Sequence, residues 1–138
     1  MSIYKKFATD STLEADKGVT IDYGDFKFTL RRAGGANKEY SKVFNDKYKP
    51  YRKMAEAGNL TDEIATRILV ETYAETVIVG WDGITDENGK KLPFNRENVI
   101  KVMTDLPELF NLVIEEATRL ANFRKEEIEA EAKNSAKS

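Results

Sequence analysis

The sequence contains no cysteine and no histidine among its 138 residues. Without cysteine, the chain cannot form a disulfide bond, a thiolate nucleophile or a sulfur-ligated metal site. Without histidine, it lacks the most common general base and the most common metal ligand. Catalysis would therefore depend on Asp, Glu, Lys, Tyr or Ser side chains alone. We expect a non-enzymatic protein that has no metal site and needs no cofactor.

The chain also lacks a long apolar run and a large excess of either charge. No apolar segment approaches the roughly 20 residues that a membrane-spanning helix needs. The 22 basic and 24 acidic residues give a formal charge of -2, whereas nucleic-acid-binding domains are typically basic. We expect a cytoplasmic protein that binds neither membranes nor nucleic acid. A length of 138 residues suits one domain with a core of its own.

Alternating apolar and polar residues predict two β-strands, over residues 19–23 and 26–30. Gly24-Asp25 separates them and is a two-residue connection of the Gly-first kind that type II′ turns prefer. An isolated hairpin is only marginally stable in water, so its apolar face must lie on helices. Residues 1–17 show no clear periodicity, and we expect them to form a loose leader.

From residue 37 onward, the apolar residues follow the 3.6-residue period of amphipathic helices. Helices are predicted over residues 37–57, 61–79 and 96–106, and from residue 107 past residue 123. Pro50 should kink or split the first helix, Thr61 and Asn95 suit N-cap positions, and Pro107 suits a first helical position.

These elements predict an α+β fold that is mainly α-helical, with four to five helices and an N-terminal β-hairpin. The globular domain should span residues 18–123. Residues 124–138 are rich in charge, and we expect a charged helical extension that ends in a disordered tail.

Residues 80–95 contain three glycines, one proline and the single tryptophan, so they cannot continue a helix. Their acidic residues do not fit a calcium-binding EF-hand loop. A frame that starts at Asp82 places Ile84 at loop position 3, where an oxygen ligand is needed, and Glu87 at position 6, where glycine is required. We interpret this stretch as a structural joint in which Asn88-Gly89 reverses the chain.

Two groups of residues are candidates for contacts with a partner. Leu112 and Phe123 fall on a second side of the last predicted helix, away from its main apolar stripe. This placement suits a partner contact, although single exposed apolar residues are common. A lysine face lies opposite the apolar side of the 37–57 helix and is either a solvated surface or a docking site for an acidic partner. The lysine face consists of Lys38, Lys42, Lys49 and Lys53.

Several short sequence motifs indicate a protein family, and they do so more specifically together than one by one. They include Asn37-Lys38-Glu39-Tyr40, Pro50-Tyr51-Arg52, Gly80-Trp81-Asp82-Gly83, Leu92-Pro93-Phe94-Asn95 and Asp105-Leu106-Pro107. Together they resemble one group of tail assembly chaperones from long-tailed bacteriophages and prophages. The resemblance covers roughly residues 19 to 133.

The resemblance implies a non-catalytic protein that binds the tape measure protein, helps recruit tail tube subunits and self-associates into homo-oligomers. It further implies action in the cytoplasm of the bacterial host and absence from the mature virion. It carries over no catalytic residues. The alternative from another class is a virion structural or adaptor protein of the tail or the head–tail junction. An enzyme that relies on carboxylates is a third possibility.

Overall fold

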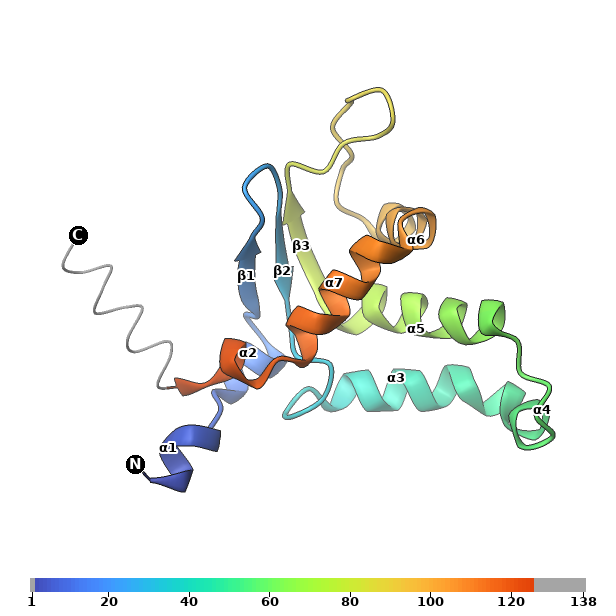
Figure 1. Cartoon of the computed structure of the whole chain (residues 1–138), viewed down its shortest axis with the longest axis horizontal. Helices are drawn as coiled ribbons and strands as arrows, with labels where there is room; N and C mark the ends of the chain where they lie inside the picture. The colour runs from blue at the N-terminus through green and yellow to red at the C-terminus, as the bar shows by residue number, and fades with distance from the viewer. Residues whose placement is uncertain (1, 126–138) are drawn as a thin grey trace.

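A computed structural model describes residues 2–125 of the chain and confirms the α+β fold (Figure 1). The elements in chain order are α1 (Ile3–Phe7), α2 (Ser11–Ala15), β1 (Val19–Asp22), β2 (Lys27–Leu30), α3 (Lys38–Tyr48), the 3₁₀ helix η1 (Lys49–Tyr51), α4 (Arg52–Glu56), α5 (Asp62–Thr76), β3 (Ile78–Asp82), α6 (Arg96–Asp105), α7 (Pro107–Thr118) and the 3₁₀ helix η2 (Leu120–Phe123). Helices α3 to α7 lie within the predicted domain, and α1 and α2 precede it.

The predicted hairpin is present and is part of a larger sheet. Strands β1 and β2 pair in antiparallel fashion, and the Tyr23 N–H donates to the Phe26 carbonyl oxygen at 2.9 Å. Gly24-Asp25 is therefore the two-residue loop, and Gly24 has the positive φ of 95° that the Gly-first turn requires. Strand β3 adds to the other side of β2, which gives an antiparallel sheet in the order β1-β2-β3.

The third strand corrects the sequence prediction that one helix extends through residue 79. Helix α5 ends at Thr76, and Ile78–Asp82 forms β3. The β-branched run from Val77 to Val79 fits a buried strand as well as a helix, so periodicity alone does not distinguish them. Pairing decides the outcome, because Ile78 lies opposite Leu30 in the register of the sheet.

Local signals placed most helix boundaries correctly. The Thr61 hydroxyl accepts a hydrogen bond from the Ile64 N–H at 3.2 Å, and the Asn95 side chain accepts one from the Asn98 N–H at 2.8 Å. Pro50 lies within η1, which separates α3 from α4 as expected from its ring. Pro107 occupies the first turn of α7, where a missing N–H leaves no hydrogen bond unmade.

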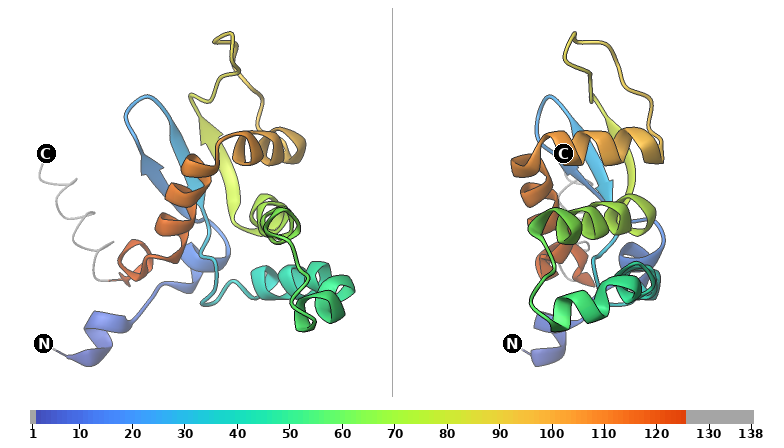
Figure 2. Two further views of the ribbon diagram at one scale, coloured as in Figure 1. Left: turned by 45° about the vertical axis from the view of Figure 1, so that its right-hand side comes forward. Right: turned by 90° about the vertical axis from the view of Figure 1, so that its right-hand side faces the viewer.

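The core lies between one face of the sheet and helices α5, α6 and α7 (Figure 2). Tyr73 of α5 is at its centre, and its ring makes edge-to-face contacts with Tyr40 of α3 at 5.8 Å and Phe110 of α7 at 5.2 Å. The opposite face of the sheet is polar, and the hydroxyl groups of Thr20 and Thr29 hydrogen-bond across it at 3.1 Å. The core therefore packs on only one face of the sheet, as is common for antiparallel sheets.

Residues 2–17 contain the two short helices α1 and α2, and one buried carboxylate attaches α2 to the domain. Glu14 is only 2% exposed and forms an ion pair with Arg32. It also accepts hydrogen bonds from the Thr9 hydroxyl at 3.0 Å and the Ala36 N–H at 3.4 Å. A single buried acid leaves no periodic pattern, so the sequence did not reveal it.

The C-terminal helix ends earlier than predicted. Helix α7 stops at Thr118, and Arg119 has an extended backbone before the 3₁₀ helix η2. The Phe123 carbonyl oxygen accepts a hydrogen bond from the Asp10 N–H at 2.8 Å, which ties η2 to the start of α2. The predicted charged extension and tail lie, from residue 126 onward, outside the described residues.

Replacing Glu14 by alanine should lower the free energy of unfolding by about 3 kcal/mol, because it leaves the partly buried Arg32 without its carboxylate. Urea denaturation monitored by circular dichroism measures the change. Glu39→Ala, at an exposed position in the first turn of α3, is the control and should change it by less than about 1 kcal/mol. Equal effects of the two substitutions would contradict the anchoring role of Glu14.

Candidate interaction surfaces

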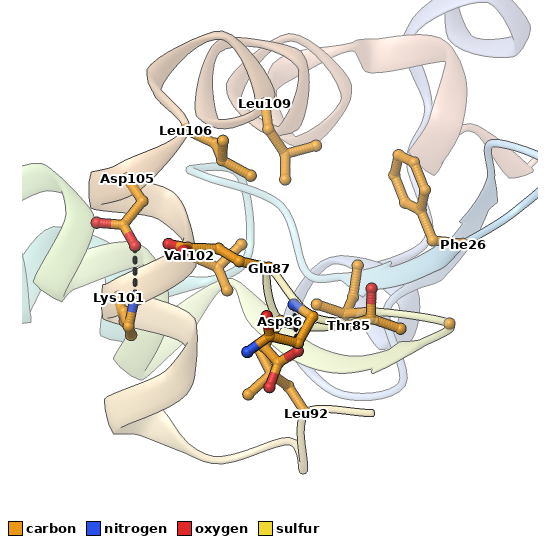
Figure 3. A pocket seen from close by; sticks show the side chains of 13 residues that line it. Phe26, Thr85, Asp86, Glu87, Leu92, Lys101, Val102, Asp105, Leu106 and Leu109 are labelled. Carbon is orange, nitrogen blue, oxygen red and sulfur yellow. Dashed lines mark hydrogen bonds and ion pairs between the residues drawn. The ribbon is translucent and has the colours of Figure 1, made fainter. Parts of the chain in front are cut away.

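An apolar groove of about 440 Å³ lies between the loop after β3 and the corner where α6 meets α7 (Figure 3). Its apolar lining comes from three separate parts of the sequence: Phe26 of the hairpin, Ile84 and Leu92 of the loop, and Val102, Leu106 and Leu109 of α6 and α7. Its volume falls within the range of about 300–1,000 Å³ that is typical of ligand sites.

The loop wall of the groove is held by the turn that the sequence predicted. The Asp86 carboxylate accepts hydrogen bonds from the Asn88 N–H at 2.8 Å and the Lys90 N–H at 2.9 Å. Gly89 has a φ of 80° and completes the reversal. This aspartate therefore shapes the loop, as an Asx turn does.

The base of the loop is attached to the sheet through Trp81. The indole N–H donates to the Leu92 carbonyl oxygen at 3.1 Å, and the ring makes edge-to-face contacts with Phe28 and Phe94. Phe94 nevertheless remains 42% exposed. The stretch is a structural joint, as predicted, but it also forms one wall of a groove that the sequence did not reveal.

Leu106 explains why sequence reasoning missed the groove. It is the last residue of the predicted 96–106 helix, yet it is 53% exposed. As the residue before Pro107, it has a non-helical backbone with φ −123° and ψ 75°, so the helical wheel no longer applies to it. The Asp-Leu-Pro sequence was the signal that could have indicated a corner at this position.

The rim of the groove carries an excess of negative charge. Three carboxylates (Asp86, Glu87 and Asp105) and one ammonium group, that of Lys101, belong to the described residues that line it. Lys101 is paired with Asp105 at 2.6 Å, and this hydrogen bond raises the pKa of the lysine. The groove therefore suits an apolar ligand that has a basic edge.

Among residues 2–125, no group of three or more Asp or Glu side chains is placed to hold a metal ion. Burial raises the pKa values of Tyr23, Tyr40 and Tyr73, which keeps these phenols neutral near pH 7. In this same part of the chain, none of the helices has the length and hydrophobicity of a transmembrane segment.

The candidate contact residues from the sequence do not converge on one surface. Leu112 is 44% exposed on α7, as a partner contact requires. Phe123 is fully buried, which corrects its assignment to the same surface, because η2 and not a continued helix directs its side chain. All four residues of the lysine face are exposed on α3, η1 and α4, so this face is a separate surface: Lys38, Lys42, Lys49 and Lys53.

Gly83 fixes the loop wall of the groove. A Cβ atom there would lie 2.4 Å from the Asp25 carbonyl oxygen, and φ is 77°. Gly83→Ala should therefore lower the free energy of unfolding by about 3 kcal/mol, from unfavourable φ plus overpacking. Gly89→Ala is the matched control, because φ is 80° but the space is open, and should cost about 1 kcal/mol. Chemical denaturation measures both, and a control as damaging as Gly83→Ala would contradict the close approach.

Comparison with known proteins indicates which kind of genome the chain comes from. The YdaY prophage protein family matches residues 35–134, a range that includes every element from α3 to η2. Searches of curated proteins and of solved structures found no match. The family match covers most of the chain and agrees with the bacteriophage or prophage origin that the resemblance implied. The protein belongs to the YdaY prophage protein family.

Proposed function

We propose that this prophage protein is a phage tail assembly chaperone. In this role it binds the tape measure protein reversibly and helps recruit tail tube subunits during tail morphogenesis. It acts in the cytoplasm of the bacterial host, without catalysis, and is left out of the mature virion. The resemblance of its sequence to tail assembly chaperones supports the role, and membership of a prophage family is consistent with it.

The observation that carries the proposal is exposed apolar surface on a charged domain. A chaperone for a long apolar helix needs apolar contacts that it can make and break. Leu112 offers such a contact on α7. Glu108 and Glu115 flank it at helical spacings of four and three residues. This patch fits a client helix that presents an apolar side chain beside basic residues.

The lysine face of α3, η1 and α4 is the alternative contact for the client, and it fits an acidic segment. Lys42 already has an acidic neighbour, Asp46, at 3.4 Å. This exposed pair contributes little to stability, so the lysine can exchange it for a partner's carboxylate.

Leu112→Gln should weaken binding of the tape measure protein about tenfold, because it removes an apolar contact without a change of charge. Titration calorimetry with a purified helical segment of the tape measure protein measures the affinity. Met54→Gln is the matched control, since Met54 is 39% exposed on another helix, and it should bind as the unchanged protein does. Equal affinities for all three proteins would contradict the α7 contact. Loss of binding only on Lys-to-Glu substitution of the lysine face would assign the client to that face.

The composition of purified phage particles separates the chaperone from the virion structural or adaptor protein. Mass spectrometry should find the tape measure protein and no copies of this chain in mature particles. Stoichiometric copies of the chain in the particle would contradict the chaperone role and identify a structural component.

A further inference from the structure

We propose that α1 of one copy of this protein docks in the groove of a second copy, so that copies join head to tail. The groove is the apolar site between the loop after β3 and the α6–α7 corner. This contact assigns surfaces for self-association. It does not depend on the client or on the proposed chaperone role.

Helix α1 presents an apolar face that stays largely exposed among the described residues. Ile3, Tyr4 and Phe7 lie on one side of the helix by their spacing of three and four residues. They are 68%, 81% and 55% exposed, among the most exposed large apolar side chains of the described residues. The Ser2 hydroxyl accepts a hydrogen bond from the Tyr4 N–H at 3.2 Å, so the helix has an N-cap, and the Lys6 carbonyl oxygen accepts one from the Arg124 side chain at 3.4 Å.

The charges of α1 and the groove are complementary. The two residues of α1 outside its apolar face are Lys5 and Lys6. Asp86 and Glu87 stand on the loop side of the groove. Glu87 lines the groove and forms no salt bridge with another described residue, whereas Asp105 is already paired with Lys101. An apolar helix face edged by two lysines therefore matches an apolar groove edged by carboxylates.

The positions of the two surfaces require that they meet between copies. Figure 1 places α1 at one end of the molecule and the loop after β3 at the other, and both views of Figure 2 agree. A contact between two different surfaces is heterologous, and it forms rings if the rotation closes and open chains if it does not. The five residues of α1 bury little area, so each contact is weak and association depends on concentration.

Sedimentation velocity of the full-length protein over a range of concentrations tests the contact. The unchanged chain should form a concentration-dependent series of oligomers. Phe7→Gln removes an apolar group from α1, and Leu106→Gln removes one from the groove. Each variant should remain monomeric at concentrations about tenfold above those at which the unchanged chain associates. Both positions are more than half exposed, at 55% and 53%, so the fold should tolerate the changes.

Mixing the two variants is the decisive part of the experiment. The Phe7→Gln protein keeps an intact groove, and the Leu106→Gln protein keeps an intact α1, so one contact can form between them. The mixture should give a heterodimer that does not grow further. Met54→Gln and Leu112→Gln lie outside both surfaces and should associate as the unchanged chain does. Folding of every variant is checked by circular dichroism.

Three results would overturn the proposal. The first is a monomeric unchanged chain at all concentrations. The second is association that persists in both variants. The third is a mixture that stays monomeric although the unchanged chain associates. If Leu112→Gln lost tape measure binding but still self-associated, the head-to-tail contact would remain supported. The test of this inference is therefore distinct from the test of the proposed function.

Discussion

The pairing of β3 with β2 is the constraint on which the rest of the structure depends. It places Trp81 opposite Phe28 and Ile78 opposite Leu30, which closes the core between the sheet and the helices. Because β3 follows α5 directly, the same pairing sets the direction in which the chain leaves the sheet. The loop after β3 therefore extends past the α6–α7 corner, and the groove exists because of that placement.

Features that depend on a few neighbouring residues could be predicted from the sequence. The Gly24-Asp25 loop and the caps at Thr61 and Asn95 are local, since each follows from the geometry of one turn. The breaks at Pro50 and Pro107 are local for the same reason. The fold class follows from these signals and from the periodicity between them.

Features that depend on distant partners could not be predicted in the same way. The strand character of Ile78–Asp82 comes from pairing with β2, and the burial of Glu14 comes from Arg32, 18 residues away. The burial of Phe123 depends on where α7 stops and on contact with the start of α2. The groove combines three separate segments of the chain. For the candidate contacts, the sequence identified exposed Leu112 and the lysine face but not the groove.

The described part of the chain carries three separate surfaces. They are an apolar groove with an acidic rim, the exposed apolar face of α1 and a basic face. Separate surfaces allow a protein to contact its own copies and a client at once, and such multivalent contacts increase avidity without a strong individual interface. This arrangement is consistent with the proposed chaperone role.

The central claim is that this prophage protein keeps the tape measure protein soluble before the tail is built. The direct measurement is the fraction of tape measure protein in the soluble part of a cell lysate, with and without co-expression of this chain. The account predicts that the tape measure protein is mostly insoluble alone and becomes soluble, in complex with this chain, on co-expression. A soluble fraction that does not change with co-expression would contradict it.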